Sequence, residues 1–454
     1  MSLLSSIPNA DEPARKTVCA VVREVLDAIN PQRIIRRCFS YKDEVVQAGE
    51  YRFELTEQAR VFVVGAGKAV VGMARQVERQ LLNRIEQGLV VAPRGRRDNA
   101  EQLEYIEVAR GAHPTPDEQG ARAAKQLLEL ADGAGPQDLV ICLISGGGSS
   151  LTTLPAEGLK LSALRRTTEL LLESGMDIRQ VNTIRKHLSA IAGGRLAQAA
   201  GRVDSLTLVL SDVVGNPLDV IASGPMVPDP TTFEDAVHLM EQFGLEPKLP
   251  QPVIDHLREG AAGGLAETPG AKASCFEGAH SVIVGDNDLA ARAAKRAAQR
   301  AGWNTAVVST FVEGEARQVA QMAVALAREV LEYQRPVQPP ACLILGGETT
   351  VTVQGNGRGG RNKELALAAL TELEDNSSIT VACFGTDGID GPTDSAGAVA
   401  DRFTRLRAHQ MGLEPTEYLT DNDSQSFFEA TGDLLVTGLT GTNVNDLYLV
   451  FVDP

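Results

Sequence analysis

Three consecutive glycines between serines form the segment with the clearest chemical potential. In order, it consists of Ser145, Gly146, Gly147, Gly148, Ser149 and Ser150. Glycine adopts backbone conformations that are closed to other residues, so a ligand can approach the chain closely. Successive backbone N–H groups beside hydroxyls suit a phosphate or a carboxylate. A flexible loop is the alternative, but it does not explain a position directly after an apolar strand, where open α/β sheets bind ligands. We therefore predict an anion site here.

A lysine stands at a second glycine-rich turn. This turn, GAGKA, contains Gly65, Gly67 and Lys68. A turn between a strand and a helix start points backbone N–H groups at an anion. A dinucleotide fingerprint fails because Val70 occupies its third glycine position. A P-loop fails because Phe62 and Ala69 occupy its first-glycine and hydroxyl positions. An anion-binding lysine and a tight turn with an exposed lysine both remain open.

Two further segments of the first half carry candidate polar residues. In NTIRKHLS, Arg185 and Lys186 are adjacent, so on a helix they point about 100° apart and cannot both face one ligand squarely. His187 could act as a general base, but a histidine beside a charged pair is more often a surface or capping residue. Asp212 follows an apolar stretch, where its carboxylate would suit a metal or a substrate hydroxyl. A helix cap or a turn explains Asp212 equally well.

The second half contains a glycine turn with two arginines. Glu348 follows two glycines at the end of an apolar run, and the turn GNGRGGRN then brings Arg358 and Arg361 next to glycines. We expect a helix from about Asn362. A guanidinium beside flexible glycines, at the start of a helix, suits phosphoryl oxygens. Two solvated arginines in a loop are the alternative.

Three aspartates follow the apolar run that ends at about residue 384. Asp387, Asp390 and Asp394 stand close together in GTDGIDGPTDSAGA. Clustered carboxylates repel one another unless a cation or a basic partner lies among them. Mg²⁺ prefers oxygen ligands, so it is the natural candidate. The alternative is a structural turn rich in Asp and Gly.

Short apolar runs alternate along the chain with longer segments rich in Ala, Leu, Arg and Glu. We expect strands over residues 60–64, 88–91, 138–144, 206–210, 281–284, 305–308, 341–345, 379–384 and 447–452. Helical periodicity is clear over residues 118–131 and 289–301. Continuous Val, Ile and Leu runs are typical of strands buried on both faces. The alternation therefore predicts an α/β fold with mostly parallel, doubly wound sheets.

A passage rich in Pro, Gly and Ala marks the expected domain boundary. We predict a first α/β domain over residues 1–240, a linker region over 241–275 and a second α/β domain over 276–454. A second joint rich in proline, at about residue 338, is interpreted as a loop within the second domain.

Composition excludes several classes of protein. Hydrophobic residues make up 43% and charged residues 22% of 454, and the formal net charge is −16. This charge disfavours nucleic acid and anionic membranes as partners. No apolar run approaches the roughly 18 residues of a membrane span, and the N-terminus lacks a signal pattern. Six scattered cysteines without a CxxC pair favour buried thiols in a reducing cytoplasm.

In combination, these motifs resemble the glycerate 2-kinase family. The resemblance rests on GAGKA, LISGGGSS, NTIRKHLSAIAGG, LSDVVGNPLDVIASGP, GGETTVTVQGNGRGGRNKE and GTDGIDGPTDSAGA, in this order. It implies two α/β domains facing each other across a cleft, with a MOFRL-like segment over about residues 340–454. It also implies ATP-dependent phosphorylation of D-glycerate at the 2-hydroxyl with a divalent cation, for which we expect Mg²⁺. A homodimer is one option for the assembly.

The resemblance also suggests site residues. Lys68 and one of Arg358 or Arg361 are expected to be the central cations, with Asp212 as a further catalytic candidate. Expected contacts to the nucleotide or substrate are Gly65, Gly67, Ser145, Gly146, Gly147, Gly148, Ser149, Ser150, Asn182, Lys186, Glu348, Gly359, Gly360 and Asn362. A hydroxypyruvate or tartronate semialdehyde reductase is the alternative enzyme. A non-catalytic protein that binds a carboxylate or a nucleotide is the third option.

Overall fold

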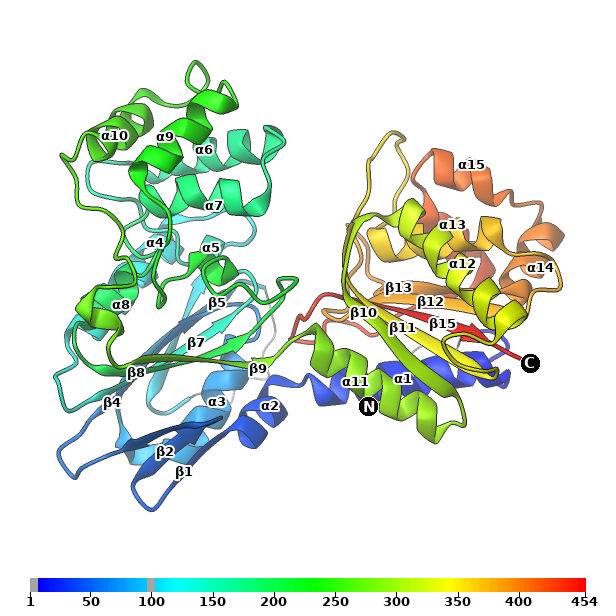
Figure 1. Ribbon diagram of the computed structural model, residues 1–454, viewed down its shortest axis with the longest axis horizontal. Coiled ribbons are helices and arrows are strands. Elements are labelled where there is room, and N and C mark those ends of the chain that lie inside the picture. Colours follow the sequence, from blue (N-terminus) through cyan, green and yellow to red (C-terminus); the bar gives the residue numbers. More distant parts are fainter. Residues whose placement is uncertain (1–6, 96–102) are drawn as a thin grey trace. The chain divides into compact units, whose positions relative to one another are not determined.

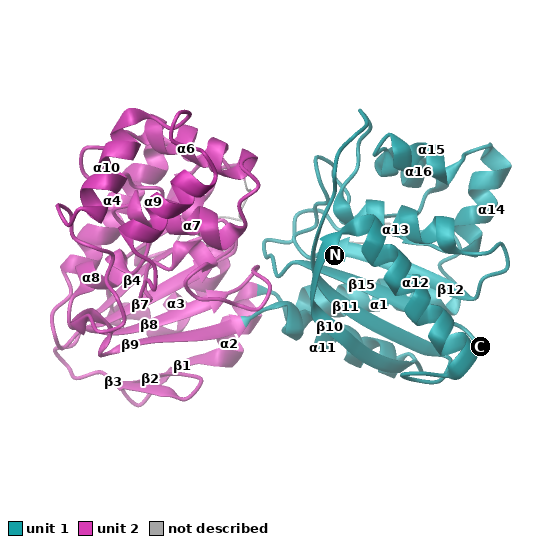
Figure 2. Ribbon diagram, turned by 45° about the horizontal axis from the view of Figure 1, so that its top comes forward, with its two compact units in different colours: residues 1–30, 285–454 teal, residues 31–284 magenta. Residues whose placement is uncertain are grey.

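The computed structural model describes residues 7–95 and 103–454, which fall into two compact units. Unit 1 comprises residues 1–30 and 285–454, and unit 2 comprises residues 31–284 (Figure 2). This division differs from the expected one. The start of the chain belongs with the C-terminal part, and residues 241–275 lie within unit 2.

A six-stranded sheet forms the centre of unit 2. Its strands, in spatial order, are β6 (Ile106–Gly111), β5 (Ile85–Pro93), β4 (Val61–Ala66), β7 (Leu139–Ser145), β8 (Asp204–Leu210) and β9 (Ala279–Gly285). The pairs from β6 to β8 are parallel. Every residue of β4 and β7 is buried, as their continuous apolar sequences predict. The carboxyl ends of these parallel strands therefore meet at one edge.

Helices cover both faces of this sheet. α4 (Glu118–Asp132) packs with its alanines and Leu127 against the face of Phe62 and Val64, and α3 (Val70–Leu81) contacts β5 and β7 (Figure 1). The shorter elements of this part are α2 (Pro31–Cys38), α5 (Gly148–Leu151), α8 (Arg195–Ala200) and the antiparallel strands β1 (Phe39–Lys42), β2 (Val45–Ala48) and β3 (Tyr51–Glu54).

A separate helical layer of unit 2 has its own apolar core. It consists of α6 (Leu161–Glu173), α7 (Ile178–His187), α9 (Phe233–Gln242) and α10 (Gln251–Ala261). The expected linker is wrong at this point, because Val253, Ile254 and Leu257 of α10 are buried in that core. The prolines that suggested a linker stand at the start of α10, where proline is well tolerated.

Unit 1 contains a second six-stranded sheet. Its order is β10 (Asn304–Glu315), β11 (Ala341–Thr350), β15 (Asp446–Val452), β12 (Ile379–Gly385), β13 (Gly397–Ala400) and β14 (Leu434–Leu435). Only β10 and β11 pair in parallel; the other pairs are antiparallel. The α/β class is confirmed, but this sheet is mixed and not mostly parallel. A continuous apolar strand indicates burial on both faces and leaves its direction undetermined.

Helices also line both faces of the sheet of unit 1. α12 (Ala316–Tyr333) and α13 (Arg361–Glu372) pack together on one face, while α1 (Pro13–Ala28) and α11 (Asn287–Arg300) pack together on the other (Figure 1). The remaining helices are α14 (Arg402–Met411), α15 (Pro415–Thr420) and α16 (Ser424–Thr431). Because α1 belongs to this unit, residues 13–28 pack in the same unit as the C-terminal part of the chain.

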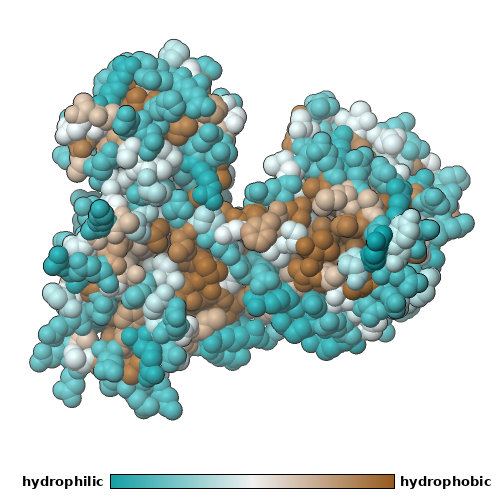
Figure 3. Space-filling view, viewed as in Figure 1, coloured by the Kyte–Doolittle hydropathy of each residue, from teal (hydrophilic) through white to brown (hydrophobic). Residues whose placement is uncertain are grey.

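The surface carries many polar groups. Figure 3 shows hydrophilic residues over much of the visible face, with apolar residues in patches between them. Within residues 7–95 and 103–454, no helix has both the length and the apolar sequence needed to cross a bilayer.

A buried charge network fastens α1 to unit 1 and generates a prediction. Arg15 is fully buried, and its guanidinium lies 2.7 Å from a carboxylate oxygen of Asp401 and 2.7 Å from one of Asp433. Replacing Arg15 by Met leaves both carboxylates without this cation, so the unfolding free energy of unit 1 should fall by about 3–5 kcal/mol. Urea denaturation measures the change.

The matched control is Arg23→Met, an exposed arginine of the same helix. It should leave the unfolding free energy nearly unchanged. Equal stability of Arg15→Met and the control would contradict the role of this network.

Candidate active site

The two glycine-rich segments of unit 2 interlock at the carboxyl edge of its sheet. The N–H of Lys68 donates to the carbonyl of Gly146 at 2.8 Å, and the N–H of Ala69 donates to Ser145 Oγ at 2.9 Å. At Gly67, φ is 141°, and an added Cβ would lie 2.1 Å from Ser145 Oγ. The turn after β4 and the loop after β7 therefore form one structure, and they require glycine to do so.

Asp212 and His113 complete the rim of this loop. A Cβ added to Gly146 would lie 1.7 Å from Asp212 Oδ2, so this carboxylate packs directly on the glycine backbone. A Cβ on Gly147 would lie 2.6 Å from His113 Cδ2 and 3.5 Å from Lys68 Cγ. The glycine loop thus brings a cation, a carboxylate and an imidazole together. His113 was not predicted, although it follows β6 and thus comes to the same edge.

The serines of the loop differ in what they contact. Ser149 Oγ lies 2.9 Å from Ser223 Oγ, and Ser223 donates to Asn182 Oδ1 at 3.3 Å. Ser150 Oγ donates to the carbonyl of Gly147 at 3.1 Å and so stabilises the loop. Asn182 is therefore placed behind the loop, where it supports Ser223. Ser223 was not singled out as a site residue, although it stands in the motif LSDVVGNPLDVIASGP.

The loop also presents backbone donors. Gly147 has a φ of 83° and is the N-cap of the single-turn helix α5. The N–H groups of Gly148, Ser149 and Ser150 form the first turn of α5, where the helix itself supplies no acceptor. These donors lie on the chain segment beside Lys68, which is the arrangement that an anion requires.

Lys186, an expected ligand contact, forms ion pairs inside the fold. Its Nζ lies 3.3 Å from Asp229 Oδ1 and 3.5 Å from Asp219 Oδ2, and the side chain is only 2% exposed. Its charge is therefore neutralised within the fold. The neighbouring His187 is also buried, with Nδ1 2.8 Å from the carbonyl of Thr183. This burial removes His187 as a general base.

Arg361 of unit 1 belongs to an ion-pair network around the buried carboxylate of Asp446. Its Nε lies 2.5 Å from Asp446 Oδ2, and its Nη1 lies 2.7 Å from Glu348 Oε1. Glu348 Oε2 also accepts from Asn445 Nδ2 at 3.0 Å. Burial raises the pKa of Asp446 to about 6, although Arg361 acts in the opposite direction. Arg361 and Glu348 are thus joined in a network that neutralises Asp446, and their expected catalytic and ligand roles stay predictions.

Arg358 lies in a different environment. Its side chain is exposed, and its backbone N–H donates to Asp423 Oδ1 at 3.0 Å. Gly359 packs against Ser424 Oγ, and Gly360 packs against Asp390, each too closely for a side chain. These glycines allow the close approach of the backbone, and their expected ligand contacts stay predictions. Of the two arginines, Arg358 is the one whose guanidinium is accessible to an anion.

The three aspartates do not form the expected metal site. Asp390 is buried and caps α13, because its Oδ1 accepts from the N–H of Asn362 and its Oδ2 from the N–H of Lys363. Lys363 Nζ is also 3.0 Å from Asp390 Oδ2. Asp387 accepts from a turn N–H, and Asp394 is exposed. In the described part of the chain, no group of three Asp, Glu, His or Cys residues suits a metal.

Asn362 contributes to the same cap with its amide nitrogen, whereas its Oδ1 has no hydrogen-bond partner among the described residues. Its side-chain Nδ2 lies 3.3 Å from Asp390 Oδ1, so it strengthens the cap of α13. The expected contact of Asn362 with the nucleotide stays a prediction.

Comparison with known proteins decides the family. Residues 17–258 match a family described as a domain of unknown function, DUF4147, and residues 341–446 match the MOFRL family. A protein of Pyrococcus horikoshii named glycerate 2-kinase is 38% identical over 433 residues, which are 95% of this chain and 96% of that protein. The chain belongs to the glycerate kinase family. The resemblance drawn from the motifs is confirmed.

Two further relatives of this glycerate kinase family member are informative. The crystal structure of a Thermotoga maritima glycerate kinase is 37% identical, with a TM-score of 0.84 over 97% of this chain and 100% of that one. An Agrobacterium vitis protein, provisionally named hydroxypyruvate reductase, is 37% identical over 93% of this chain and 95% of its own length. The family thus includes proteins with both names.

The pair of Arg361 and Asp446 predicts a pH-dependent stability. The pKa of Asp446 is about 6 instead of its ordinary 3.8, so between these values the folded state binds more protons than the unfolded state. Stability from this group falls as the pH rises through that window. Removing Arg361 should raise the pKa of Asp446 further and extend the loss to higher pH. Arg361→Gln should therefore lower Tm more at pH 8 than at pH 5.

Thermal unfolding of Arg358→Gln is the control, since this arginine lies in the same turn but is exposed. Equal losses of Tm at both pH values for Arg361→Gln would show that Arg361 does not hold the Asp446 carboxylate.

Proposed function

We propose that this member of the glycerate kinase family transfers the terminal phosphoryl group of ATP to the 2-hydroxyl of D-glycerate. One observation carries the proposal: Lys68 lies against the glycine loop of residues 145–150, whose first-turn N–H groups point away from their own helix. Identity of 38% to a protein named glycerate 2-kinase supports the choice of substrates.

Phosphoryl transfer requires positioning and charge neutralisation more than covalent chemistry from the protein. In this proposal, the ammonium of Lys68 and the N–H groups of residues 148–150 bind phosphoryl oxygens, on which charge develops during transfer. Donors that are already oriented stabilise this charge without rearranging at the moment of reaction. The Ser150 hydroxyl contributes indirectly, because it holds the carbonyl of Gly147.

Asp212 is the candidate acceptor for the proton of the substrate hydroxyl. Its carboxylate packs on Gly146, next to the segment that carries Lys68. A carboxylate that accepts the proton of a neighbouring hydroxyl makes the hydroxyl oxygen a better nucleophile. His113 lies against the neighbouring Gly147 and is the second candidate for this task.

Mg²⁺ is expected because ATP would be the phosphoryl donor. The trio of Asp387, Asp390 and Asp394 does not fit the ion, since Asp390 is committed to α13 and Lys363. Mg²⁺ is usually held by substrate phosphates with one or two carboxylates. A dedicated three-carboxylate site is therefore not part of this proposal, and no catalytic step depends on one.

Three broader expectations also stand as proposals. All six cysteines are free thiols, which supports a reducing cytoplasm as the location. The net charge of −16 supports small-molecule substrates over nucleic acid and membrane partners. A homodimer is kept as the option for assembly.

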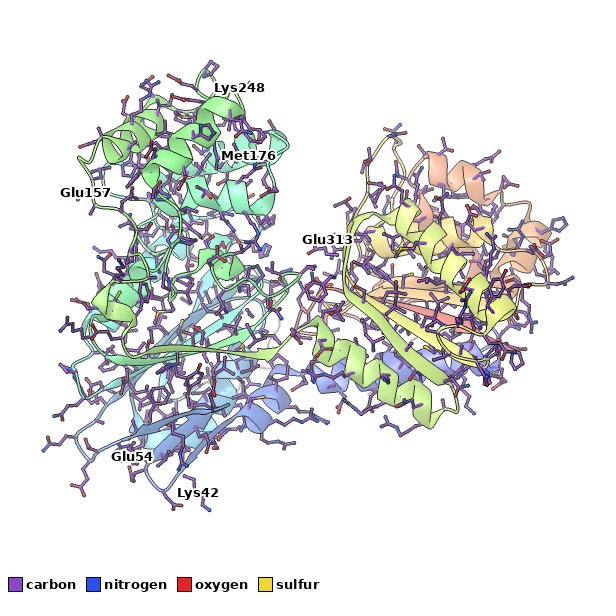
Figure 4. The ribbon with its side chains drawn as sticks, in the orientation of Figure 1. Lys42, Glu54, Glu157, Met176, Lys248 and Glu313 are labelled. Atoms are coloured by element: carbon purple, nitrogen blue, oxygen red, sulfur yellow. The ribbon has the colours of Figure 1, made fainter. Side chains whose placement is uncertain are left out.

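The decisive experiment combines substrate turnover with one variant. The parent protein, given ATP, Mg²⁺ and D-glycerate, should yield 2-phosphoglycerate, identified by ³¹P NMR. Lys68→Met should lower kcat by roughly 10²–10³-fold, because a contact to the transferring phosphoryl group is worth about 2–4 kcal/mol. Lys42→Met is the control: this lysine is exposed at the end of β1, as Figure 4 shows.

Parental turnover in Lys68→Met would contradict the assigned role of Lys68. NADH oxidation with hydroxypyruvate, without phosphorylation of D-glycerate, would instead identify a reductase. Ligand-induced stabilisation without either turnover would indicate a binding protein.

A further inference from the structure

A narrow pocket of unit 2 lies beside the glycine loop. Residues from α5, α6, α7 and the segment after α7 line it, and its volume is about 30 Å³. Ser149 and Ser223, whose hydroxyls lie 2.9 Å apart, form part of its wall. Since Ser149 belongs to the first turn of α5, the pocket is next to the loop that carries the proposed chemistry.

Arg185 is the only charged residue that lines this pocket, within the described part of the chain. Burial lowers the pKa of Arg185, and no described carboxylate contributes an opposing effect. Lys186, the adjacent residue, is by contrast neutralised by Asp219 and Asp229. Arg185 is partly buried, and a guanidinium in a pocket wall without an acidic partner is suited to an anion that enters with the ligand.

A second observation is independent of Arg185. Thr167 of α6 is fully buried, lines the same pocket, and its Oγ1 has no hydrogen-bond partner among the described residues. A buried hydroxyl without a partner is unusual and costs free energy. Ser189, also in the wall, accepts from the N–H groups of Ile191 and Ala192, so its own hydroxyl hydrogen can be donated to a ligand.

The rest of the wall is mixed, with the hydroxyl side chains Thr152, Thr153 and Thr168 beside apolar ones. Leu164, Leu188 and Ile191 contribute to it. A volume of about 30 Å³ holds roughly two water-sized groups, which matches a carboxylate and excludes a nucleoside. One arginine balances the single charge of a carboxylate, whereas a phosphate dianion would leave a net negative charge in a pocket with no second cation among the described residues.

We propose that this pocket binds the carboxylate of the hydroxy acid substrate, with Arg185 as the charged partner and Thr167 and Ser189 as hydroxyl donors. The inference rests on the proposed function for the identity of the acid. It places the acid between α6 and α7, with the rest of the molecule directed toward the glycine loop. The sequence did not predict this pocket, because the residue types and spacing of α7 do not indicate which of its residues face inward.

A larger pocket of unit 2 is a poorer anion site. Its volume is about 540 Å³, and Glu129, Asp132 and Glu157 line it together with Arg195. Glu157 lies at the edge of the unit, as Figure 4 shows. Three carboxylates around one guanidinium repel an acid, so this pocket does not compete for the substrate carboxylate.

The test measures binding without turnover. Isothermal titration calorimetry with D-glycerate alone, its neutral analogue D-glyceramide, ADP and inorganic phosphate is carried out on the parent, Arg185→Gln and Arg179→Gln. Arg179 is an exposed arginine of the same helix and provides the matched control. Arg185→Gln should weaken D-glycerate binding roughly 10- to 100-fold, the effect of losing a hydrogen-bonded charge. It should also abolish the preference for D-glycerate over D-glyceramide, while ADP binding and the control stay at parental values.

Thr167→Val removes only the hydroxyl and is the second variant, with an expected loss of severalfold in D-glycerate affinity. It keeps the test decisive if Arg185→Gln does not fold. Parental D-glycerate affinity in the folded variants, or no binding to the parent, overturns the proposal. Weakened ADP or phosphate binding with unchanged D-glycerate binding also overturns it and assigns the pocket to a nucleotide phosphate. If D-glycerate binding depends on Arg185 but the parent does not phosphorylate it, the pocket stands and the kinase function fails.

Discussion

The carboxylate of Asp212 lies against the Cα of Gly146, and the candidate site depends on this contact. A Cβ at position 146 would lie 1.7 Å from Asp212 Oδ2, so any other residue would displace either the carboxylate or the loop. In the same loop, the carbonyl of Gly146 accepts a hydrogen bond from the backbone N–H of Lys68. Cation and carboxylate are thus both positioned by one stretch of backbone. Parallel strands make this possible, because their carboxyl ends bring distant segments to a common edge.

The charged residues of the motifs divide into two groups. Lys186, Arg361 and Lys363 each form an ion pair with at least one carboxylate inside the fold. These pairs fix helices and loops, and breaking one leaves an uncompensated charge. Arg358 is exposed, and Arg185 lines a pocket that contains no carboxylate among the described residues. A charged side chain in a glycine-rich motif is therefore informative only once its partners are known.

The class of fold and most of the central strands could be predicted from the sequence. Each of the nine apolar runs expected to be strands overlaps a strand of the two large sheets. Strand direction in unit 1 was not predictable, because β15 enters between β11 and β12 from the far end of the chain. The proline-rich segment around α10 was misinterpreted, since proline is common both in linkers and at helix starts.

The parts of the candidate site that depend on glycine backbone conformation could be predicted from the sequence. The parts that depend on the direction of a side chain could not. Glycines at the ends of β4 and β7 predicted an anion site from conformation alone. The choice between Arg185 and Lys186 depended on which face of α7 packs inward, and the preferred residue proved to be the paired one. The contacts of Asp390 could not be predicted either, because an aspartate that caps a helix and one that binds a metal stand in similar sequences. In the structure, Asp390 caps α13.

The central claim is that Gly146 serves catalysis by allowing Asp212 to lie against the loop. The most direct test is a double-mutant cycle in kcat for the ATP-dependent phosphorylation of D-glycerate. It compares the parent, Gly146→Ala, Asp212→Asn and the double variant, with Tm measured for each. We expect each single variant to lose roughly 10²-fold or more in kcat, and the double variant to be no slower than Asp212→Asn, since the effects of coupled residues are not additive. Parental kcat in Gly146→Ala, or single losses that multiply in the double variant, would contradict this claim.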